Sequence, residues 1–161
     1  MGKQYESRHK FFELPIKERI NMFEDILEFH RFVNKQGYVA IDFYDGSIMY
    51  DFQNKRTIIC DIEYYAKKPY VNTVGRMWGS GRFMSPEEYE KGSVIDEITN
   101  VYLMGATAFV LLGNAVEKSI EGWLAHKALY DVAKKAASKD RNQRYQSLEV
   151  LSATWKQAKQ R

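Results

Sequence analysis

Two aspartates bracket a predicted β-hairpin, and carboxylates held in this way can act as a chemical pair. Asp42 follows an extended apolar segment, and Asp61 stands nineteen positions later. Between them, Ser47–Phe52 and Arg56–Cys60 are predicted strands joined by a short turn. Aspartates at strand ends are often turn or capping residues. A hairpin also returns the chain to its starting point, however, so it would bring the two carboxylates close enough for acid–base or metal chemistry.

The segments before and after this hairpin differ in their pattern. Apolar residues at helical spacing predict a helix over Leu14–Val33, ended by residues 34–37. The segment Gly37–Ile41 is predicted to be extended. Ile62–Gly81 contains proline, asparagine and three glycines with no sustained period, which predicts a long exposed loop. Loops of this length in a small domain tend to be functional.

Helices dominate the second half of the chain. Ser85, Pro86 and Glu88 form a capping-box pattern at the start of a short helix. The stretch Glu97–Leu112 is apolar on nearly all sides, which is typical of a helix buried in the middle of a domain, and Gly113 is its natural end. Further helices are predicted at Val116–Leu124, His126–Ser138 and Ser147–Lys159.

Length and composition indicate one folded domain over residues 1–161, because 45% of the residues are hydrophobic and 28% charged. The predicted fold class is mainly α with a small β-hairpin, a central buried apolar helix and a long loop. The 24 basic and 21 acidic residues are spread along the chain, so the net charge of +3 indicates neither nucleic acid nor a membrane as partner. The N-terminus lacks a signal-peptide core, so the expected location is cytoplasmic.

Cysteine and histidine do not suggest a metal site. Cys60 is the only cysteine, which excludes an internal disulfide, and its apolar neighbours predict a small buried hydrophobic side chain. The histidines, His9, His30 and His126, lie far apart and pair with no cysteine at ligand spacing.

Five short motifs follow one another along the chain: Asp42 with Ser47-Ile48-Met49, then Cys60-Asp61-Ile62-Glu63, Gly79–Glu87, Ile95–Gly105 and Asp140–Arg144. In this order they resemble the C-terminal lobe of a protein kinase, over about Leu14 to Trp155. The resemblance is, in turn, to the catalytic loop, the metal-binding Asp-Phe-Gly, the Gly-Thr-x-x-Tyr-Met-Ala-Pro-Glu end of the activation segment, the buried helix after it, and the Asp-Pro-x-x-Arg stretch.

The resemblance implies a role for each carboxylate of the pair. Asp42 would orient the substrate hydroxyl and accept its proton, while Asp61 and Ser47 would hold Mg²⁺ against the phosphates of ATP. Ser80 would line a pocket of the kind that accepts serine or threonine. Glu87 would form a structural ion pair with the arginine of the last motif, Arg144.

Several positions depart from the kinase pattern. Ala40–Ile41 replaces the usual His-Arg pair, so a switch by loop phosphorylation is not expected. Ser47 replaces the metal-binding asparagine, and Tyr44 replaces a lysine whose charge would face the transferring phosphate. Glu63 replaces a glycine. Asn100 replaces an aspartate of the buried helix that bonds to the catalytic-loop backbone, a bond that an amide can still accept.

The chain also lacks the elements that bind ATP in a complete kinase. It contains no Gly-x-Gly-x-x-Gly loop, and most of the residues before Asp42 form one helix. We therefore expect an ATP- and Mg²⁺-dependent kinase lobe that acts on a protein substrate and is inactive without an N-terminal lobe from the parent gene or a partner chain. The face toward that lobe should be apolar, which predicts homodimers or poor solubility.

Two other functions remain open. The departures from the pattern would also suit a pseudokinase or interaction module. A small-molecule kinase of the choline or aminoglycoside type is the other alternative, because Asp61-Ile62-Glu63 resembles the Asp-Phe-Glu of that group. The Ser-Pro-Glu helix start and Arg144 disfavour it.

Overall fold

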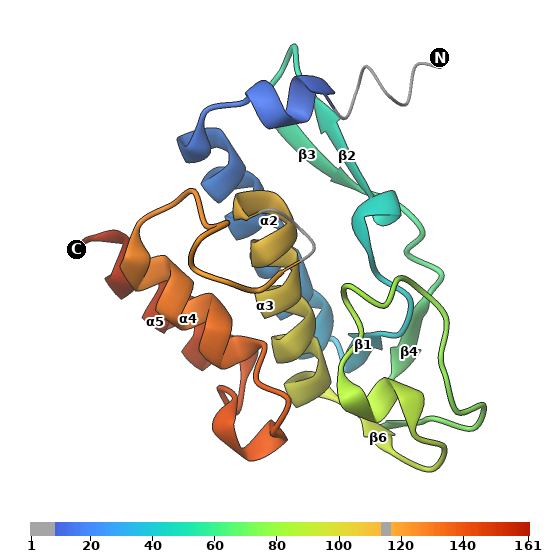
Figure 1. Ribbon diagram of the computed structural model, residues 1–161. Coiled ribbons are helices and arrows are strands. Elements are labelled where there is room, and N and C mark those ends of the chain that lie inside the picture. Colours follow the sequence, from blue (N-terminus) through green and yellow to red (C-terminus); the bar gives the residue numbers. More distant parts are fainter. Residues whose placement is uncertain (1–8, 114–116) are drawn as a thin grey trace.

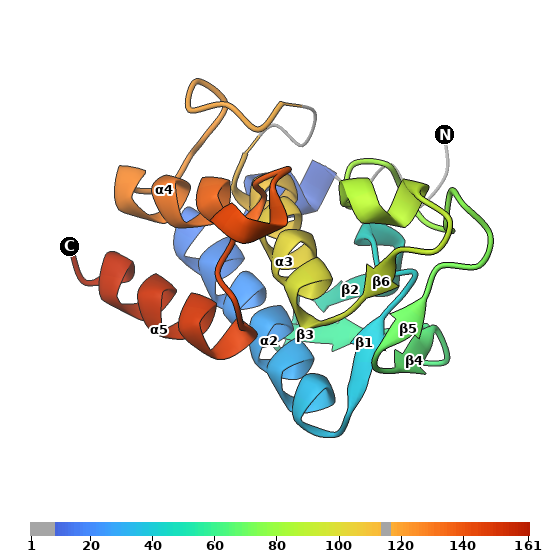
Figure 2. The ribbon, with the colours of Figure 1, turned by 90° about the horizontal axis from the view of Figure 1, so that it is seen from below.

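A single buried helix, α3 (Glu97–Leu112), lies at the centre of the fold (Figures 1 and 2). The computed structural model describes residues 9–113 and 117–161. Every residue of α3 from Thr99 onward is buried, as its apolar sequence predicts. Asp96 caps the first turn, since its side chain accepts hydrogen bonds from the backbone N–H groups of Ile98 and Thr99. The helix ends at Gly113, where the sequence predicts its end.

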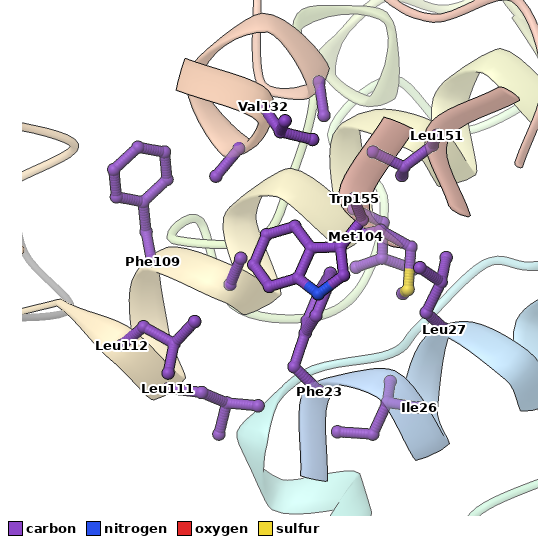
Figure 3. Packing of buried hydrophobic residues seen from close by; sticks show 14 of the residues in the cluster. Phe23, Ile26, Leu27, Met104, Phe109, Leu111, Leu112, Val132, Leu151 and Trp155 are labelled. Atoms are coloured by element: carbon purple, nitrogen blue, oxygen red, sulfur yellow. The ribbon is translucent and has the colours of Figure 1, made fainter. Parts of the chain in front are cut away.

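The other long helices pack around α3: α2 (Ile16–Lys35), α4 (Lys127–Ala136) and α5 (Leu148–Lys159). The rings of Phe23 on α2 and Trp155 on α5 lie 4.3 Å apart between centroids, and this pair fills the core between the helices (Figure 3). Helix α4 approaches α3 at Gly105, where a Cβ atom would lie 2.6 Å from the backbone nitrogen of Ala137. A glycine is therefore needed at that crossing.

The strands form three two-stranded antiparallel sheets on the side of α3 away from α4 and α5 (Figure 2). They pair β1 (Tyr38–Ala40) with β4 (Tyr65–Lys67), β2 (Ile48–Asp51) with β3 (Arg56–Ile59), and β5 (Tyr70–Val71) with β6 (Val94–Ile95). Single 3₁₀ turns also occur, at η1 (Asp45–Ser47), η2 (Pro86–Tyr89) and η3 (Arg141–Gln143).

The predicted hairpin is present as β2 and β3, with one face against α2 and the other in solvent. Thr57 on the inner face donates a 2.9 Å hydrogen bond to Asp25 of α2. Met49 and Ile58 pair across the strands on the outer face, and Met49 is 56% exposed. Cys60 at the end of β3 is half-buried, less than its apolar neighbours predict, and its sulfur lies 3.4 Å from that of Met49.

The structure confirms the coarse prediction of a mainly α chain with a small β component. The predicted helices at Leu14–Val33, Glu97–Leu112, His126–Ser138 and Ser147–Lys159 are present as α2 to α5, with ends that differ by a few residues. None of the helices in the described ranges combines the length and apolar character that a bilayer-spanning segment needs.

Two segment predictions need correction. The predicted loop Ile62–Gly81 contains β4 and β5 and buries Asn72 and Met77. Strands of two or three residues are too short to show a period, and their partners lie far away in the sequence, so no local pattern indicates them.

The predicted helix Val116–Leu124 is wrong for residues 117–124, which are irregular apart from a turn at residues 121–122; Val116 lies outside the described residues. Gly122 lowers the helical propensity there. Trp123 packs its ring 5.2 Å from that of Phe109, and the N–H of Leu124 donates to the carbonyl of Leu112. Packing against the end of α3 therefore decides the conformation.

Candidate functional site

Asp42 lies just beyond β1, and a buried side chain of α3 holds this end of the strand. Asn100 accepts a 2.8 Å hydrogen bond from the N–H of Ala40 and donates a 3.1 Å bond to its carbonyl oxygen. Both residues are buried. The bond expected between Asn100 and this loop is therefore present, and the amide satisfies two backbone groups where a carboxylate could accept from only one.

Asp61 is brought back toward Asp42 by the hairpin and by the turn after it. The N–H of Cys60 donates to the carbonyl of Ser47, which closes the base of the hairpin. Asp61 itself has a left-handed backbone with φ of 57°, a conformation that aspartate tolerates better than most residues. The following residues pair with the end of β1, since Ile41 N–H donates to the carbonyl of Tyr64.

The two carboxylates are close enough to influence each other. Burial raises the pKa of Asp42, and the negative charge of Asp61 raises it further. Neither of these two causes is a nearby positive charge, which would lower the pKa. The structure thus brings together the two aspartates that the sequence singled out, and both effects raise the pKa of Asp42 above its ordinary value.

Ser47 lies at the base of the hairpin beside Cys60, and its hydroxyl oxygen is buried with no hydrogen-bond partner among the described residues. The residue is 1% exposed. Buried hydroxyls nearly always have a partner, because leaving one unpaired costs about 1–3 kcal/mol. The unpaired Ser47 oxygen therefore marks a position where a ligand could replace the missing partner.

A third segment, carrying Gly79 and Ser80, reaches Asp42 from the long loop. Gly79 has φ of +100°, and a Cβ atom on it would lie 2.9 Å from Oδ1 of Asp42. That oxygen is buried and has no hydrogen-bond partner within the described ranges. Ser80, half-buried, starts a turn in which its carbonyl accepts from the N–H of Phe83. We call Asp42, Ser47, Asp61 and Gly79 the aspartate site.

An ion pair at the edge of the aspartate site is not evident from the sequence. Nη2 of Arg82 donates to both carboxylate oxygens of Asp45, at 2.9 and 2.8 Å. The two residues are 37 positions apart, so no local spacing indicates their contact. Tyr44, next to Asp45, turns its ring over Gly46 and packs against the core. Tyr44 therefore does not supply the positive charge that a lysine has at this position of the kinase pattern.

The predicted pair of Glu87 and Arg144 is present and buried. Arg144 donates from Nη1 and Nη2 to the two carboxylate oxygens of Glu87, at 2.6 and 3.0 Å, and its side chain is 0% exposed. Its Nε atom donates to the carbonyl of Ser138. This bidentate geometry is the strong form of an arginine–carboxylate contact.

Three further side chains complete this buried network, and the sequence did not single them out. Arg141 donates to Glu87 at 2.9 Å and to both oxygens of Asp96, and Thr99 donates to Glu87 at 3.1 Å. Burial works to raise the pKa of Glu87, but the bond from Arg144 and the charges of Arg144 and Arg141 outweigh it and hold the pKa at about 2. We call Glu87, Asp96, Thr99, Arg141 and Arg144 the anchor cluster.

Glu88 lies next to the anchor cluster and differs from it in charge state. Its carboxylate accepts hydrogen bonds from the backbone N–H and the hydroxyl of Ser85, at 2.6 and 2.8 Å, as the capping-box pattern predicts. Burial nevertheless raises its pKa to about 7, because no cation pairs with it directly. Two adjacent glutamates thus have widely separated pKa values.

The donor set suits a magnesium ion only in combination with phosphate. Among residues 9–113 and 117–161, no three His, Cys, Asp or Glu side chains cluster in an arrangement that could hold a metal. Magnesium in phosphoryl-transfer sites usually binds one or two carboxylates, with phosphate and water oxygens as the other ligands. Asp61 offers one such carboxylate, and Ser47 has a buried hydroxyl without a partner among the described residues; these are the two residues that would hold the ion.

Comparisons with protein-family models and with curated proteins identify no family for this chain. No protein-family model matches the chain, and no curated protein matches it. The resemblance to a kinase lobe therefore depends on the order of the motifs and on the contacts described above.

Proposed function

We propose that this chain is the C-terminal lobe of a serine/threonine protein kinase-like phosphotransferase. Together with a nucleotide-binding lobe it would transfer the γ-phosphoryl group of ATP to a protein hydroxyl. The observation that supports this most is the meeting of Asp42, Asp61 and Gly79, which come from three separate segments in the order of the kinase motifs. The Glu87–Arg144 pair at the far end of the same segment adds support.

Each residue of the aspartate site has a task in this proposal. Asp42 orients the acceptor hydroxyl and takes its proton, and its raised pKa brings it nearer to the range in which a general base works well at neutral pH. Asp61 and Ser47 hold the metal ion. When bound, Mg²⁺–ATP supplies the phosphoryl group and neutralises its developing charge. Ser80 lines the pocket for the substrate serine or threonine.

The proposal is tested by joining the chain to the nucleotide-binding lobe of a protein kinase and measuring phosphate transfer from ATP to casein. Replacing Asp42 with Asn should lower transfer by about 100-fold or more, because general-base catalysis contributes that much. Asp51→Asn is the matched control, since Asp51 ends β2 and its side chain, within the described ranges, hydrogen-bonds only to residues 53 and 54. Equal turnover of the Asp42→Asn and control proteins would contradict the proposal.

Calorimetry on the chain by itself examines the metal residues. If the chain binds ATP with Mg²⁺, Asp61→Asn should abolish binding while Glu63→Gln, which changes an exposed carboxylate two positions away, should not. Absence of binding in all three proteins would mean that the other lobe supplies the nucleotide contacts.

An interaction module without catalysis is the second candidate, and one feature of the aspartate site favours it. Gly79 covers Oδ1 of Asp42, and the hydroxyl of Ser47 is buried. A site that stays closed in this way would neither bind nucleotide nor transfer phosphate in the joined protein, whereas binding of a protein partner would persist in the Asp42→Asn variant.

A further inference from the structure

Among the residues that the structure describes, no cation forms an ion pair with Asp42 or Asp61, and a phosphoryl group would bring additional negative charge to this site. Burial and Asp61 both act on Asp42 in the direction that disfavours negative charge. The position two residues after Asp42 carries Tyr44, whose ring lies over Gly46 and against the core. A phosphoryl group beside Asp42 would need a positive charge from another segment, because charge stabilisation is the main contribution of a protein to this reaction.

Arg82 is a cation that the fold brings to this edge, in addition to Arg76, whose guanidinium donates to the carbonyl of Gly79. Gly79 lies against Asp42, and Arg82 follows Gly79 by three residues. The Cα atoms of Gly79 and Arg82 are therefore at most about 11 Å apart. Arg82 in turn contacts Asp45, which follows Asp42 by three residues. The segments therefore touch at two points, and the guanidinium lies beside the second.

The hydrogen bonds of Arg82 leave most of its donors available. Both bonds to Asp45 use Nη2, so Nη1 and Nε have no hydrogen-bond partner among the residues that the structure describes. The side chain is 35% exposed, and Asp45 is 40% exposed. Both two-donor edges of a guanidinium include Nη2, so phosphate can accept single charge-assisted hydrogen bonds from Nη1 or Nε, or two parallel bonds after it displaces Asp45.

We propose that Arg82, held in place by Asp45, is the residue that binds the phosphoryl group beside Asp42 and supplies the charge that Tyr44 cannot. This inference depends on the proposed function, and it adds to it a positively charged residue from the activation-segment-like loop. Asp45 is then a positioning residue, which orients the guanidinium and competes with phosphate for it.

The experiment titrates the chain with inorganic phosphate at pH 7 and follows the arginine Nε–H signals by nuclear magnetic resonance. The Arg82 signal should shift on addition of phosphate, and Arg82→Gln should weaken binding about tenfold or more, the loss expected for a charge-assisted hydrogen bond. Arg82→Lys should bind with intermediate affinity, since it keeps the charge but loses the fork. Arg76→Gln is the matched control. Arg76 lies on the same loop, but its guanidinium already donates to the carbonyls of Met77 and Gly79.

Asp45→Asn gives a second readout of opposite sign. Removing the competing carboxylate should tighten phosphate binding several-fold, an effect that a purely structural ion pair would not produce. Unchanged phosphate affinity in both Arg82→Gln and Asp45→Asn, or phosphate-induced shifts confined to the Nε–H signals of other arginines, would overturn the inference. Because the titration needs no turnover, its outcome is distinguishable from failure of the casein assay, which tests the proposed function.

Discussion

The anchor cluster and the aspartate site lie at the two ends of one segment, from Gly79 to Glu87. They differ in whether their buried polar atoms have hydrogen-bond partners. In the anchor cluster both carboxylate oxygens of Glu87 and all three side-chain nitrogens of Arg144 have partners. In the aspartate site, Oδ1 of Asp42 and the hydroxyl of Ser47 are buried without a partner among the described residues. An unpaired buried polar atom lowers stability. The contrast indicates that the anchor cluster stabilises the fold, and it is consistent with our proposal that the aspartate site binds a ligand.

The largest expected effect comes from breaking the anchor cluster. Arg144→Ala should lower the free energy of unfolding by about 3–5 kcal/mol, because it leaves the buried carboxylate of Glu87 without its main partner. Thermal denaturation measures this. Arg141→Ala is the control: its side chain is 31% exposed, so its loss should cost clearly less. Equal melting temperatures for Arg144→Ala and the unmodified protein would show that the pair does not stabilise the fold.

The pH dependence separates the two neighbouring glutamates. The pKa of Glu88 is raised to about 7 in the folded protein, so its contribution to stability is full below pH 4.5 and is lost as the pH rises toward 7. Glu88→Gln keeps an acceptor for Ser85 and should remove this loss, which is on the order of 3 kcal/mol.

The measurement is the difference between the unfolding free energies of Glu88→Gln and the unmodified protein from pH 4.5 to 7.5. It should increase with pH. Burial lowers the pKa of His30 to about 4, so the contribution of His30 to stability is lost as the pH falls. His30 is present in both proteins, so its effect cancels in the difference. A difference independent of pH would mean that Glu88 is charged in the folded protein near neutrality.

The bond that holds the end of β1 should show an intermediate effect. Asn100→Ala leaves the buried N–H and carbonyl of Ala40 unpaired, at a cost of about 2 kcal/mol. Asn142→Ala, an exposed asparagine whose side chain makes no hydrogen bond among the described residues, should change stability by less than about 0.5 kcal/mol. Chemical denaturation compares the two. Similar costs would indicate that solvent satisfies Ala40 in the variant.

The smallest expected effect comes from comparing two serines, one in the aspartate site and one beside the anchor cluster. Ser47 and Ser85 are both buried serines, but only Ser85 has a side-chain partner, Glu88. Ser85→Ala should therefore cost about 1 kcal/mol, whereas Ser47→Ala should leave stability unchanged or raise it slightly. A cost for Ser47→Ala as large as that for Ser85→Ala would show that the Ser47 hydroxyl is satisfied in solution, and that it marks no ligand position.

Local chemistry in the sequence determined much of what can be recognised here. Helical periodicity located α2 to α5, the two strand-like runs located the hairpin, and Ser85 with Glu88 located the helical turn η2. Two long-range contacts were expected from the resemblance to a kinase lobe rather than from local chemistry. They join Glu87 to Arg144 across 57 positions and Asn100 to Ala40 across 60 positions. These features depend on neighbours in the chain or on a pattern that the residues themselves carry.

Only the tertiary structure decided the remaining contacts, because each depends on groups that meet through packing. The β1–β4 pairing inside the expected loop, the turn that seats Trp123 against Phe109, and the Arg82–Asp45 pair have no local signal. The same holds for the unpaired state of the Asp42 and Ser47 oxygens. A sequence shows which groups could form hydrogen bonds, but whether a buried group has a partner depends on every segment that surrounds it.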